Sequence, residues 1–248
     1  MPEVVLPEEE KQPTPPVFTN EPRNIEMKFQ DGIGLVEGYV EPHVCDAIIN
    51  SFDYWYERKF ITNDHTLDRV VAMDQHGKEM MQSIDTGMDG SKQFGKRGQL
   101  GRKDTQLFLE THDKSMALAL TKVVGDAFQL YTAEYNGMVD SADPLSSWTY
   151  KVQRTSPGGG YHVWHCENGS FLYRDRVCTW MIYLNDIPYE NGGATDFLHQ
   201  KTSFQPTKGT VVFWPACYTH MHRGAFLTGD TDKYIATGWF CREPRPGM

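Results

Sequence analysis

The sequence predicts a mainly β protein, in which a jelly roll forms the C-terminal part and helices support it on the N-terminal side. From residue 147 onward, eight short runs rich in β-branched and aromatic residues are separated by clusters of Gly, Pro, Asn and Asp. These turn clusters recur at intervals of roughly 8 to 12 residues, which is typical of antiparallel sandwiches and barrels, and eight strands indicate a jelly roll. Earlier in the chain, two segments carry apolar residues at helical spacing. No repeat of fixed period is visible, which argues against a solenoid or a propeller.

The composition is that of a soluble globular protein with an acidic surface. The 248 residues are 39% apolar and 23% charged, as in ordinary globular chains. The 33 Asp and Glu outnumber the 24 Lys and Arg and give a net charge of −9, so we expect no broad nucleic-acid binding. No apolar run reaches the ~18 residues that span a bilayer, and the N-terminus lacks the basic and apolar regions of a secretion signal. We therefore expect a cytoplasmic protein that does not bind membranes, with its five scattered cysteines as reduced thiols.

The N-terminal part divides into a tail and a helical support. Residues 1–24 are rich in Pro and Glu and predict a flexible tail, with an arm packed on the body as the alternative. Residues 25–248 are expected to form a single domain, with helical support over 40–146 and the jelly-roll core over 147–242. The segment Asp85 to Lys103 is rich in Gly, Lys and Asp and is long for a connection, so it predicts either a lid or a disordered loop.

Each supporting element has its own signal. The pattern GIGLVEGY at 32–39 predicts a strand, and Pro42 suits the first turn of a helix because its missing N–H costs nothing there. That helix has an apolar stripe made of Cys45, Ile48, Ile49, Phe52 and Trp55. A second amphipathic helix is predicted after Asp113. Its expected buried face consists of Met116, Leu120, Val123, Val124, Ala127 and Leu130.

The eight predicted strands fall within residues 148–155, 161–167, 176–186, 194–198, 202–206, 209–215, 220–226 and 232–240. His165 and Glu167 are two apart, and because side chains alternate along a strand, both project from one face and can bind one metal ion. His220 and His222 are also two apart, and either completes a site of two histidines and one carboxylate, the facial triad of Fe(II) oxygenases. Strand alternation does not choose between them. Lys233, in an apolar strand, is either an edge residue or the partner of an anion near that site.

The order of these features resembles the Fe(II)- and 2-oxoglutarate-dependent oxygenases, in particular the prolyl 4-hydroxylase-like branch. The resemblance spans about Tyr150 to Trp239. The matching elements are His165 and Glu167, Arg176 and Thr179, Tyr183-Leu184-Asn185-Asp186, Gly192-Gly193-Ala194-Thr195-Asp196-Phe197, Pro206, Lys208 and Gly209, Phe213 and Trp214, His222 and Gly224, and Lys233. Six ordered elements are a far more specific signal than any one of them.

The resemblance implies a double-stranded β-helix, which is a jelly roll, and assigns roles to individual residues. It places Fe(II) on His165, Glu167 and His222 and leaves His220 either in the wall of the site or behind the ligands. It implies that Lys233 holds the far carboxylate of 2-oxoglutarate, with Tyr150 and Thr179 as hydrogen-bonding candidates there. O2 is the second co-substrate, and ascorbate is an accessory cofactor compatible with the family. His162 lies three before His165 and so is expected to be structural.

The chain departs from the family pattern in two places. Glu167 stands where the family usually has Asp, and the extra methylene moves the carboxylate about 1.5 Å outward, so the backbone or the rotamer must adjust. Lys233 follows His222 by eleven residues, one more than usual, which a longer turn at 229–232 absorbs.

The resulting hypothesis is a dioxygenase that hydroxylates a substrate C–H bond and releases succinate and CO2. The substrate is expected to be a peptide, protein or small molecule, with a prolyl residue as the first choice. Arg102, Asp104 and Trp239 are candidate substrate contacts, with a solvated surface or plain core packing as the alternatives. Two rival functions remain open: a cupin-like metal-binding module without turnover, and a three-histidine dioxygenase that uses His220 and needs no 2-oxoglutarate.

Overall fold

The computed structural model describes residues 13–16, 25–61, 63–64, 72–73, 79–80, 102–139, 144–147 and 149–243. Most of the predicted tail, and the predicted lid up to residue 101, lie outside these residues. The helices are α1 (Pro42–Glu57), α2 (Leu109–His112) and α3 (Lys114–Glu134), with short 3₁₀ turns η1 (Asn136–Met138), η2 (Phe171–Tyr173), η3 (Tyr189–Asn191) and η4 (Tyr218–His220).

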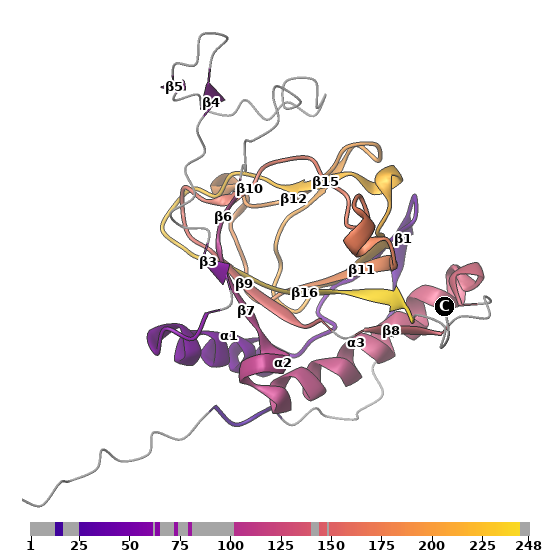
Figure 1. Cartoon of the computed structure of the whole chain (residues 1–248), viewed down its shortest axis with the longest axis horizontal. Coiled ribbons are helices and arrows are strands. Elements are labelled where there is room, and N and C mark those ends of the chain that lie inside the picture. The colour runs from indigo at the N-terminus through magenta and orange to yellow at the C-terminus, as the bar shows by residue number, and fades with distance from the viewer. Residues whose placement is uncertain are drawn as a thin grey trace, which may run out of the picture.

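Two antiparallel sheets face each other and confirm the predicted jelly roll (Figure 1). The larger sheet has the order β1-β2-β14-β11-β16-β9-β7-β3, and β8 pairs with β16 beside this path. Its strands are β1 (Lys28–Gln30), β2 (Ile33–Val36), β14 (Val211–Pro215), β11 (Arg176–Tyr183), β16 (Lys233–Arg242), β9 (Lys151–Thr155), β7 (Thr105–Phe108), β3 (Asn63–Asp64) and β8 (Leu145–Ser147). The smaller sheet has the order β13-β12-β15, from β13 (Thr202–Phe204), β12 (Thr195–Phe197) and β15 (His222–Gly224).

Two short ribbons complete the strands. The pair of β10 (Gly160–Tyr161) and β6 (Arg102–Lys103) lies beside the smaller sheet (Figure 1), so the C-terminal end of the predicted lid segment joins the edge of the core. A second pair consists of β4 (Ala72–Met73) and β5 (Glu79–Met80).

The three helices lie on one face of the larger sheet, as Figure 1 shows. Helix α1 begins at Pro42, as predicted, and buries Val44, Cys45, Ile48 and Phe52. Asp113 caps α3, because its Oδ1 accepts the backbone N–H of Met116 at 3.0 Å. The stripe predicted for α3 is buried with one exception. Leu130 is exposed because it lies at the edge of the stripe, and Phe128 and Tyr131 take the buried positions on that turn.

Strand alternation divides the larger sheet into a helix-facing side and an inner side. On β9 and β16, Val152, Ala236 and Phe240 belong to the core cluster that includes the buried residues of α1 and α3. The residues between them face the opposite way and line a cavity toward the smaller sheet. The helices therefore supply apolar backing and hold the larger sheet as a firm wall of the cavity.

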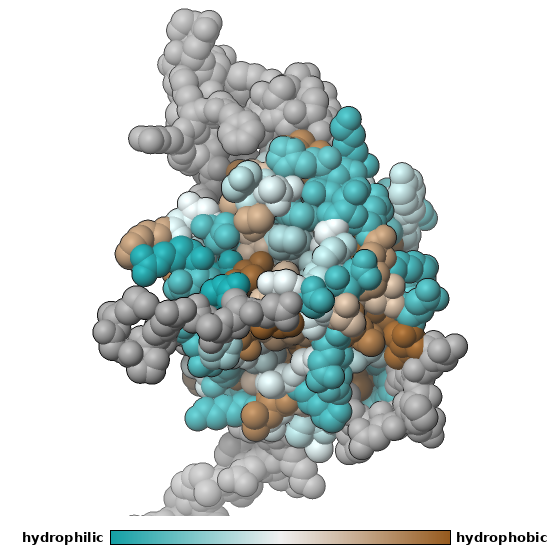
Figure 2. Space-filling view, turned by 90° about the vertical axis from the view of Figure 1, so that its right-hand side faces the viewer, coloured by the Kyte–Doolittle hydropathy of each residue, from teal (hydrophilic) through white to brown (hydrophobic). Residues whose placement is uncertain are grey.

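The surface agrees with the composition. Hydrophilic side chains cover most of the face in Figure 2, and hydrophobic ones gather in a few patches. All five cysteines are free, as predicted. Among the described residues, the helices are either too short or too polar to cross a bilayer.

Candidate metal and co-substrate site

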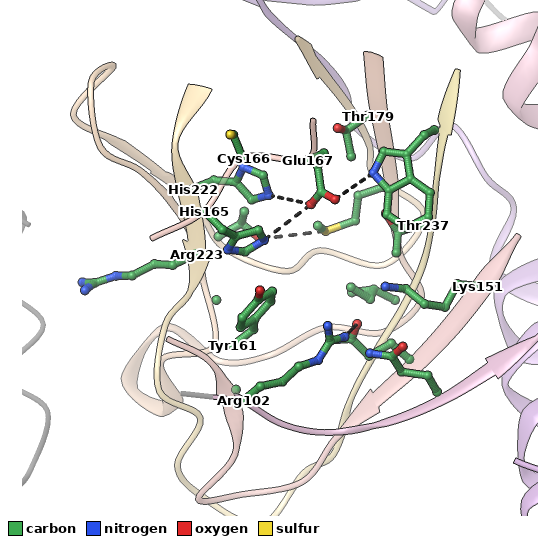
Figure 3. A pocket seen from close by; sticks show the side chains of 18 of the residues that line it. Arg102, Lys151, Tyr161, His165, Cys166, Glu167, Thr179, His222, Arg223 and Thr237 are labelled. Atoms are coloured by element: carbon green, nitrogen blue, oxygen red, sulfur yellow. Dashed lines mark hydrogen bonds and ion pairs between the residues drawn. The ribbon is translucent and has the colours of Figure 1, made fainter. Parts of the chain in front are cut away.

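A cavity of about 860 Å³ lies between the two sheets (Figure 3). Residues of β9, β11 and β16 line it from the larger sheet, and residues of β12 and β15 line it from the smaller one. Besides the three metal-ligand candidates, the lining includes four of the site residues expected from the sequence, namely Arg102, Thr179, Lys233 and Trp239. The cavity is large enough for a small co-substrate and part of a second molecule.

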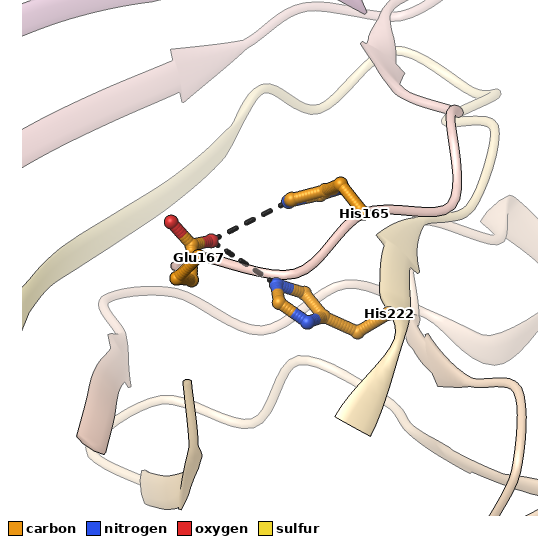
Figure 4. Close-up of side chains that lie close together, drawn as sticks. All are labelled: His165, Glu167 and His222. Carbon is orange, nitrogen blue, oxygen red and sulfur yellow. Dashed lines mark hydrogen bonds and ion pairs between the residues drawn. The ribbon is translucent and has the colours of Figure 1, made fainter. Parts of the chain in front are cut away.

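His165, Glu167 and His222 meet at one wall of this cavity (Figure 4). Their nearest donor atoms all lie within 4.8 Å of one another. Glu167 Oε1 is 3.4 Å from His165 Nε2 and 3.2 Å from His222 Nε2. The arrangement therefore offers two imidazole nitrogens and one carboxylate oxygen to a single ion, the donor set that suits Fe(II).

Backbone pairing brings the two histidines together. His165 and His222 form an isolated antiparallel bridge, in which each N–H donates to the other's carbonyl at 3.0 and 2.9 Å. The expected strand over 161–167 is wrong, because only Gly160–Tyr161 is a strand and the chain then becomes irregular. Glu167 is placed instead by its N–H, which donates to the carbonyl of Ala216 after β14. The side chains converge although the strand argument for them does not hold.

Each ring is oriented by a hydrogen bond on its far nitrogen. The Nδ1 of His165 lies 2.8 Å from the carbonyl of Val163, and the Nδ1 of His222 lies 2.9 Å from that of His220. A carbonyl only accepts, so both Nδ1 atoms carry hydrogen, and the Nε2 lone pairs of the neutral rings face Glu167. Burial lowers the pKa of His165, which favours the neutral ring. Two lone pairs aimed at a carboxylate repel it unless a cation lies between them, so these residues fit a metal ion.

The longer side chain of Glu167 is held by groups outside the triad. Its Oε2 accepts a hydrogen bond from Trp239 Nε1 at 2.9 Å and one from Arg176 Nη1 at 3.2 Å. Two donors on one oxygen, one of them the charged Arg176 guanidinium, favour the ionised form of this carboxyl. The carboxylate is thus ionised, with one oxygen directed to the histidines and the other fixed by two donors.

Lys233 lies in the same cavity on strand β16. It is 7% exposed, and its Nζ donates to the carbonyl of Gly193 at 2.6 Å. Burial lowers the pKa of Lys233 to about 8, so the ammonium form still prevails at neutral pH. Two of its three N–H donors remain for an anion. Thr195 lines the cavity near it and bonds to the Tyr183 hydroxyl at 2.8 Å.

The two hydrogen-bonding candidates proposed beside Lys233 do not lie there. Tyr150 faces the helices, packs on Trp180 and donates its hydroxyl to the carbonyl of Ser147. Thr179 does line the cavity, but it pairs with Trp239, six residues along β16 from Lys233, which is roughly 20 Å. Its buried Oγ1 has no hydrogen-bond partner among the described residues, and Figure 3 shows it close to Glu167. Thr179 therefore belongs to the metal end of the cavity.

The remaining candidates separate into cavity residues and supports. Arg102 lines the cavity and forms an ion pair with buried Asp104 at 2.7 Å, so neither is a solvated surface residue. His220 lies in η4 and not on a strand with His222, and its Nε2 lies 2.9 Å from the carbonyl of Asp31. His162 is buried, with Nδ1 3.0 Å from the carbonyl of Gly224, as expected of a structural histidine.

Two cavity residues escaped the sequence reasoning. Thr195 belongs to the Gly-Gly-x-Thr element, so its place in that motif was a usable signal. Lys151 looked like an ordinary residue of a predicted strand, and only the pairing of β9 with β16 shows that it shares a face with Trp239.

Comparison with known families agrees with this geometry. Residues 150–241 match the family model of the 2OG-Fe(II) oxygenase superfamily. This region is a 2OG-Fe(II) oxygenase domain. The chain is accordingly a 2-oxoglutarate-dependent dioxygenase, and Fe(II), 2-oxoglutarate and O2 are the cofactor and co-substrates of its superfamily. No curated protein matches the sequence.

Solved prolyl hydroxylases share the fold of this oxygenase. The collagen prolyl hydroxylase of Paramecium bursaria Chlorella virus-1, solved with 2OG, is 17% identical with a TM-score of 0.55, over 86% of this chain and 97% of that one. A prolyl-4-hydroxylase of Pseudomonas putida is 15% identical with a TM-score of 0.57, over 86% and 94% of the two chains. A prolyl hydroxylase of Trichoplax adhaerens, solved with a hypoxia inducible factor peptide, is 13% identical with a TM-score of 0.57, over 85% and 84%. At these identities the likeness concerns the fold.

Proposed function

We propose that this oxygenase binds Fe(II) through His165, Glu167 and His222 and hydroxylates a C–H bond of its substrate. The observation that carries the proposal is the convergence of two neutral, backbone-oriented imidazoles on one ionised carboxylate inside a cavity. Bound there, Fe(II) supplies the oxygen chemistry by which a C–H bond becomes C–OH while 2-oxoglutarate is converted to succinate and CO2.

Residues of the cavity would bind 2-oxoglutarate, orient the metal ligand Glu167 and exclude water from the site. Lys233 offers two N–H donors to the far carboxylate of 2-oxoglutarate, and that carboxylate would give its buried ammonium a partner of opposite charge. Thr195 and Thr155, the cross-strand partner of Lys233, add hydroxyls to the wall of the same cavity. Trp239 and Arg176 hold Glu167 in its orientation. Trp214 and Met181 line the same cavity with apolar surface and exclude water.

A prolyl residue of a peptide or protein is the substrate that we propose first. Each of the three solved relatives is named a prolyl hydroxylase, and one of them holds a peptide. Beside Ser170 and Tyr173, which line the cavity, Phe171 and Leu172 are 76% and 80% exposed. This apolar turn supplies a contact for a substrate that extends beyond the cavity, as a peptide does.

The geometry disfavours the two rival functions. A three-histidine site needs the His220 ring among the donors, but both nitrogens of that ring are engaged, with Thr219 and with Asp31. A module without turnover has no need of Lys233 buried in the same cavity as the triad. Burying a lysine is costly, which favours a role for it in anion binding.

The test is succinate formation by the purified protein with Fe(II), 2-oxoglutarate and O2, followed by mass spectrometry of proline-containing peptides for a gain of one oxygen atom. His165→Ala should abolish succinate, whereas His199→Ala, at an exposed histidine outside the cavity, should not. Equal turnover by wild type and His165→Ala would refute the assignment. Succinate without oxygen on any prolyl peptide would keep the oxygenase and discard the substrate.

A further inference from the structure

A second lysine, Lys151, is buried in the same cavity and has no part in the chemistry described above. It is 8% exposed, and the surface it retains faces the cavity. In the register of β9 and β16, Lys151 pairs with Thr237 and Thr155 pairs with Lys233. The two lysines are thus four positions apart along one sheet face, roughly 13 Å.

The two lysines mark opposite ends of the cavity. Lys233 lies over the Tyr183 ring and against Gly193. Lys151 lies 5.3 Å from the centre of the Trp239 ring, at the end where Glu167 and Arg176 are found. Exposed Ser170 and Tyr173 line the cavity as well, and Tyr173 packs on Arg176, so this end opens to solvent. Figure 3 shows Lys151 reaching into the cavity between Glu167 and Arg102.

Lys151 differs from the arginines around it because its charge is unpaired. Arg102 is bound to Asp104, and Arg176 is bound to Glu167. Among the described residues, Lys151 Nζ makes neither a hydrogen bond nor an ion pair. It lies over the face of Trp239, and the carboxylates of Glu167 and Asp104 act on it only from a distance. Burial lowers the pKa of Lys151 to about 8. The protein therefore keeps a largely charged, desolvated ammonium with three unused donors at the outer end of the cavity.

Loading the site does not neutralise this end. Bound Fe(II) would be balanced by Glu167 and the near carboxylate of 2-oxoglutarate, and Lys233 by the far carboxylate. Asp104 balances Arg102. Arg176, whose partner Glu167 would be shared with the metal, and Lys151 remain as excess positive charge next to the place that the substrate must enter. A buried cation without a partner is costly, so an anion that enters at this end would be stabilised by Lys151.

We propose that Lys151 binds a carboxylate of the substrate, so that the oxidised carbon lies close to an acidic group. The inference rests on the proposed function and adds the substrate class to it. The carboxylate comes either from a free acid of small size or from an acidic residue or C-terminus of a peptide. The Trp239 ring lies beside this position, in contact with both Lys151 and Arg176, and Tyr161 lines the same cavity.

The experiment compares matched acids and amides on protein loaded with Fe(II) and saturating 2-oxoglutarate without O2, so that no turnover occurs. The small pair is N-acetylproline and N-acetylprolinamide, and the peptide pair is Ac-Ala-Pro-Glu-Ala-NH₂ and its Gln counterpart. Calorimetry should show the acid of at least one pair bound about 10- to 100-fold more tightly than its amide, as expected of one hydrogen-bonded ion pair. The pair that shows the difference identifies the source of the carboxylate.

Lys151→Met should remove this preference, because it weakens binding of the acid and leaves binding of the amide unchanged. Lys233→Met is the matched change at the other cavity lysine. It should weaken binding of 2-oxoglutarate and keep the preference for the acid once 2-oxoglutarate saturates the site. The proposal would be overturned if acid and amide bind equally in both pairs, or if neither acid binds. It would also be overturned if Lys151→Met keeps the preference for the acid or loses affinity for 2-oxoglutarate. Failure of the proposed function is distinct, because it appears as absent 2-oxoglutarate binding or absent succinate in wild type.

Discussion

Replacing Trp239 by Phe tests whether the position of Glu167 governs metal binding. The change removes the indole N–H that donates to Glu167 Oε2 at 2.9 Å and keeps an aromatic ring in the cavity wall. A hydrogen bond to a charged acceptor is worth about 1.5 to 3 kcal/mol. Arg176 continues to donate to the same oxygen, so we expect the lower value, which corresponds to about a tenfold loss of metal affinity.

The assay is a titration of the protein with Fe(II) under anaerobic conditions, repeated with Mn(II), which is not oxidised. Trp214→Phe is the matched control, because Trp214 also lines the cavity but its Nε1 has no partner among the described residues. That variant loses no bond to Glu167 and keeps an aromatic ring against His222, so its metal affinity should stay close to that of wild type. Equal losses in the two variants, or none in Trp239→Phe, would refute the role assigned to this hydrogen bond.

Three further outcomes follow from the geometry. In a metal-content assay, His222→Ala should lose iron and His220→Ala should keep most of it, because only His222 directs Nε2 at Glu167; the reverse result would move the ligand to His220. Lys233→Met should strongly weaken the binding of 2-oxoglutarate and leave the iron content unchanged. In wild type the ammonium is lost as pH rises through about 8, so 2-oxoglutarate affinity should fall above that pH, and a profile unchanged in Lys233→Met would contradict this. In urea unfolding, Asp113→Ala should cost about 2 to 3 kcal/mol, because it removes the cap of α3 and leaves the Ser51 hydroxyl without its acceptor; an unchanged midpoint would show that this cap is dispensable.

The overall architecture was predictable because its signals are local. Turn clusters and alternation locate seven of the eight predicted runs close to observed strands, and Pro42 and Asp113 mark the two long helices. The prediction of a strand over 161–167 was wrong, because apolar and aromatic content alone does not ensure that a partner strand lies beside the segment. There the chain is held by the single bridge between His165 and His222.

The candidate site was predictable only in part, for a different reason. The ordered motif places His165, Glu167, His222 and Lys233 in one cavity, but it carries no information on which face of a strand meets the helices. Tyr150 illustrates the limit, since a hydroxyl in the right segment proved to be helix-facing. Lys151 illustrates the converse, because its environment is created by strand pairing that one sequence does not reveal.

Strand β16 carries Lys233, Ile235, Thr237 and Trp239 on a single face, from one end of the cavity to the other. The distance between the anion-binding lysine at its start and the residue that holds Glu167 at its end is therefore fixed by the length of one strand. A shift of this strand by one residue would replace all four side chains by those of Tyr234, Ala236, Gly238 and Phe240. Mutational tolerance should follow this geometry: substitutions that keep the strand length change one end at a time, whereas a single insertion or deletion within it should disable both ends together.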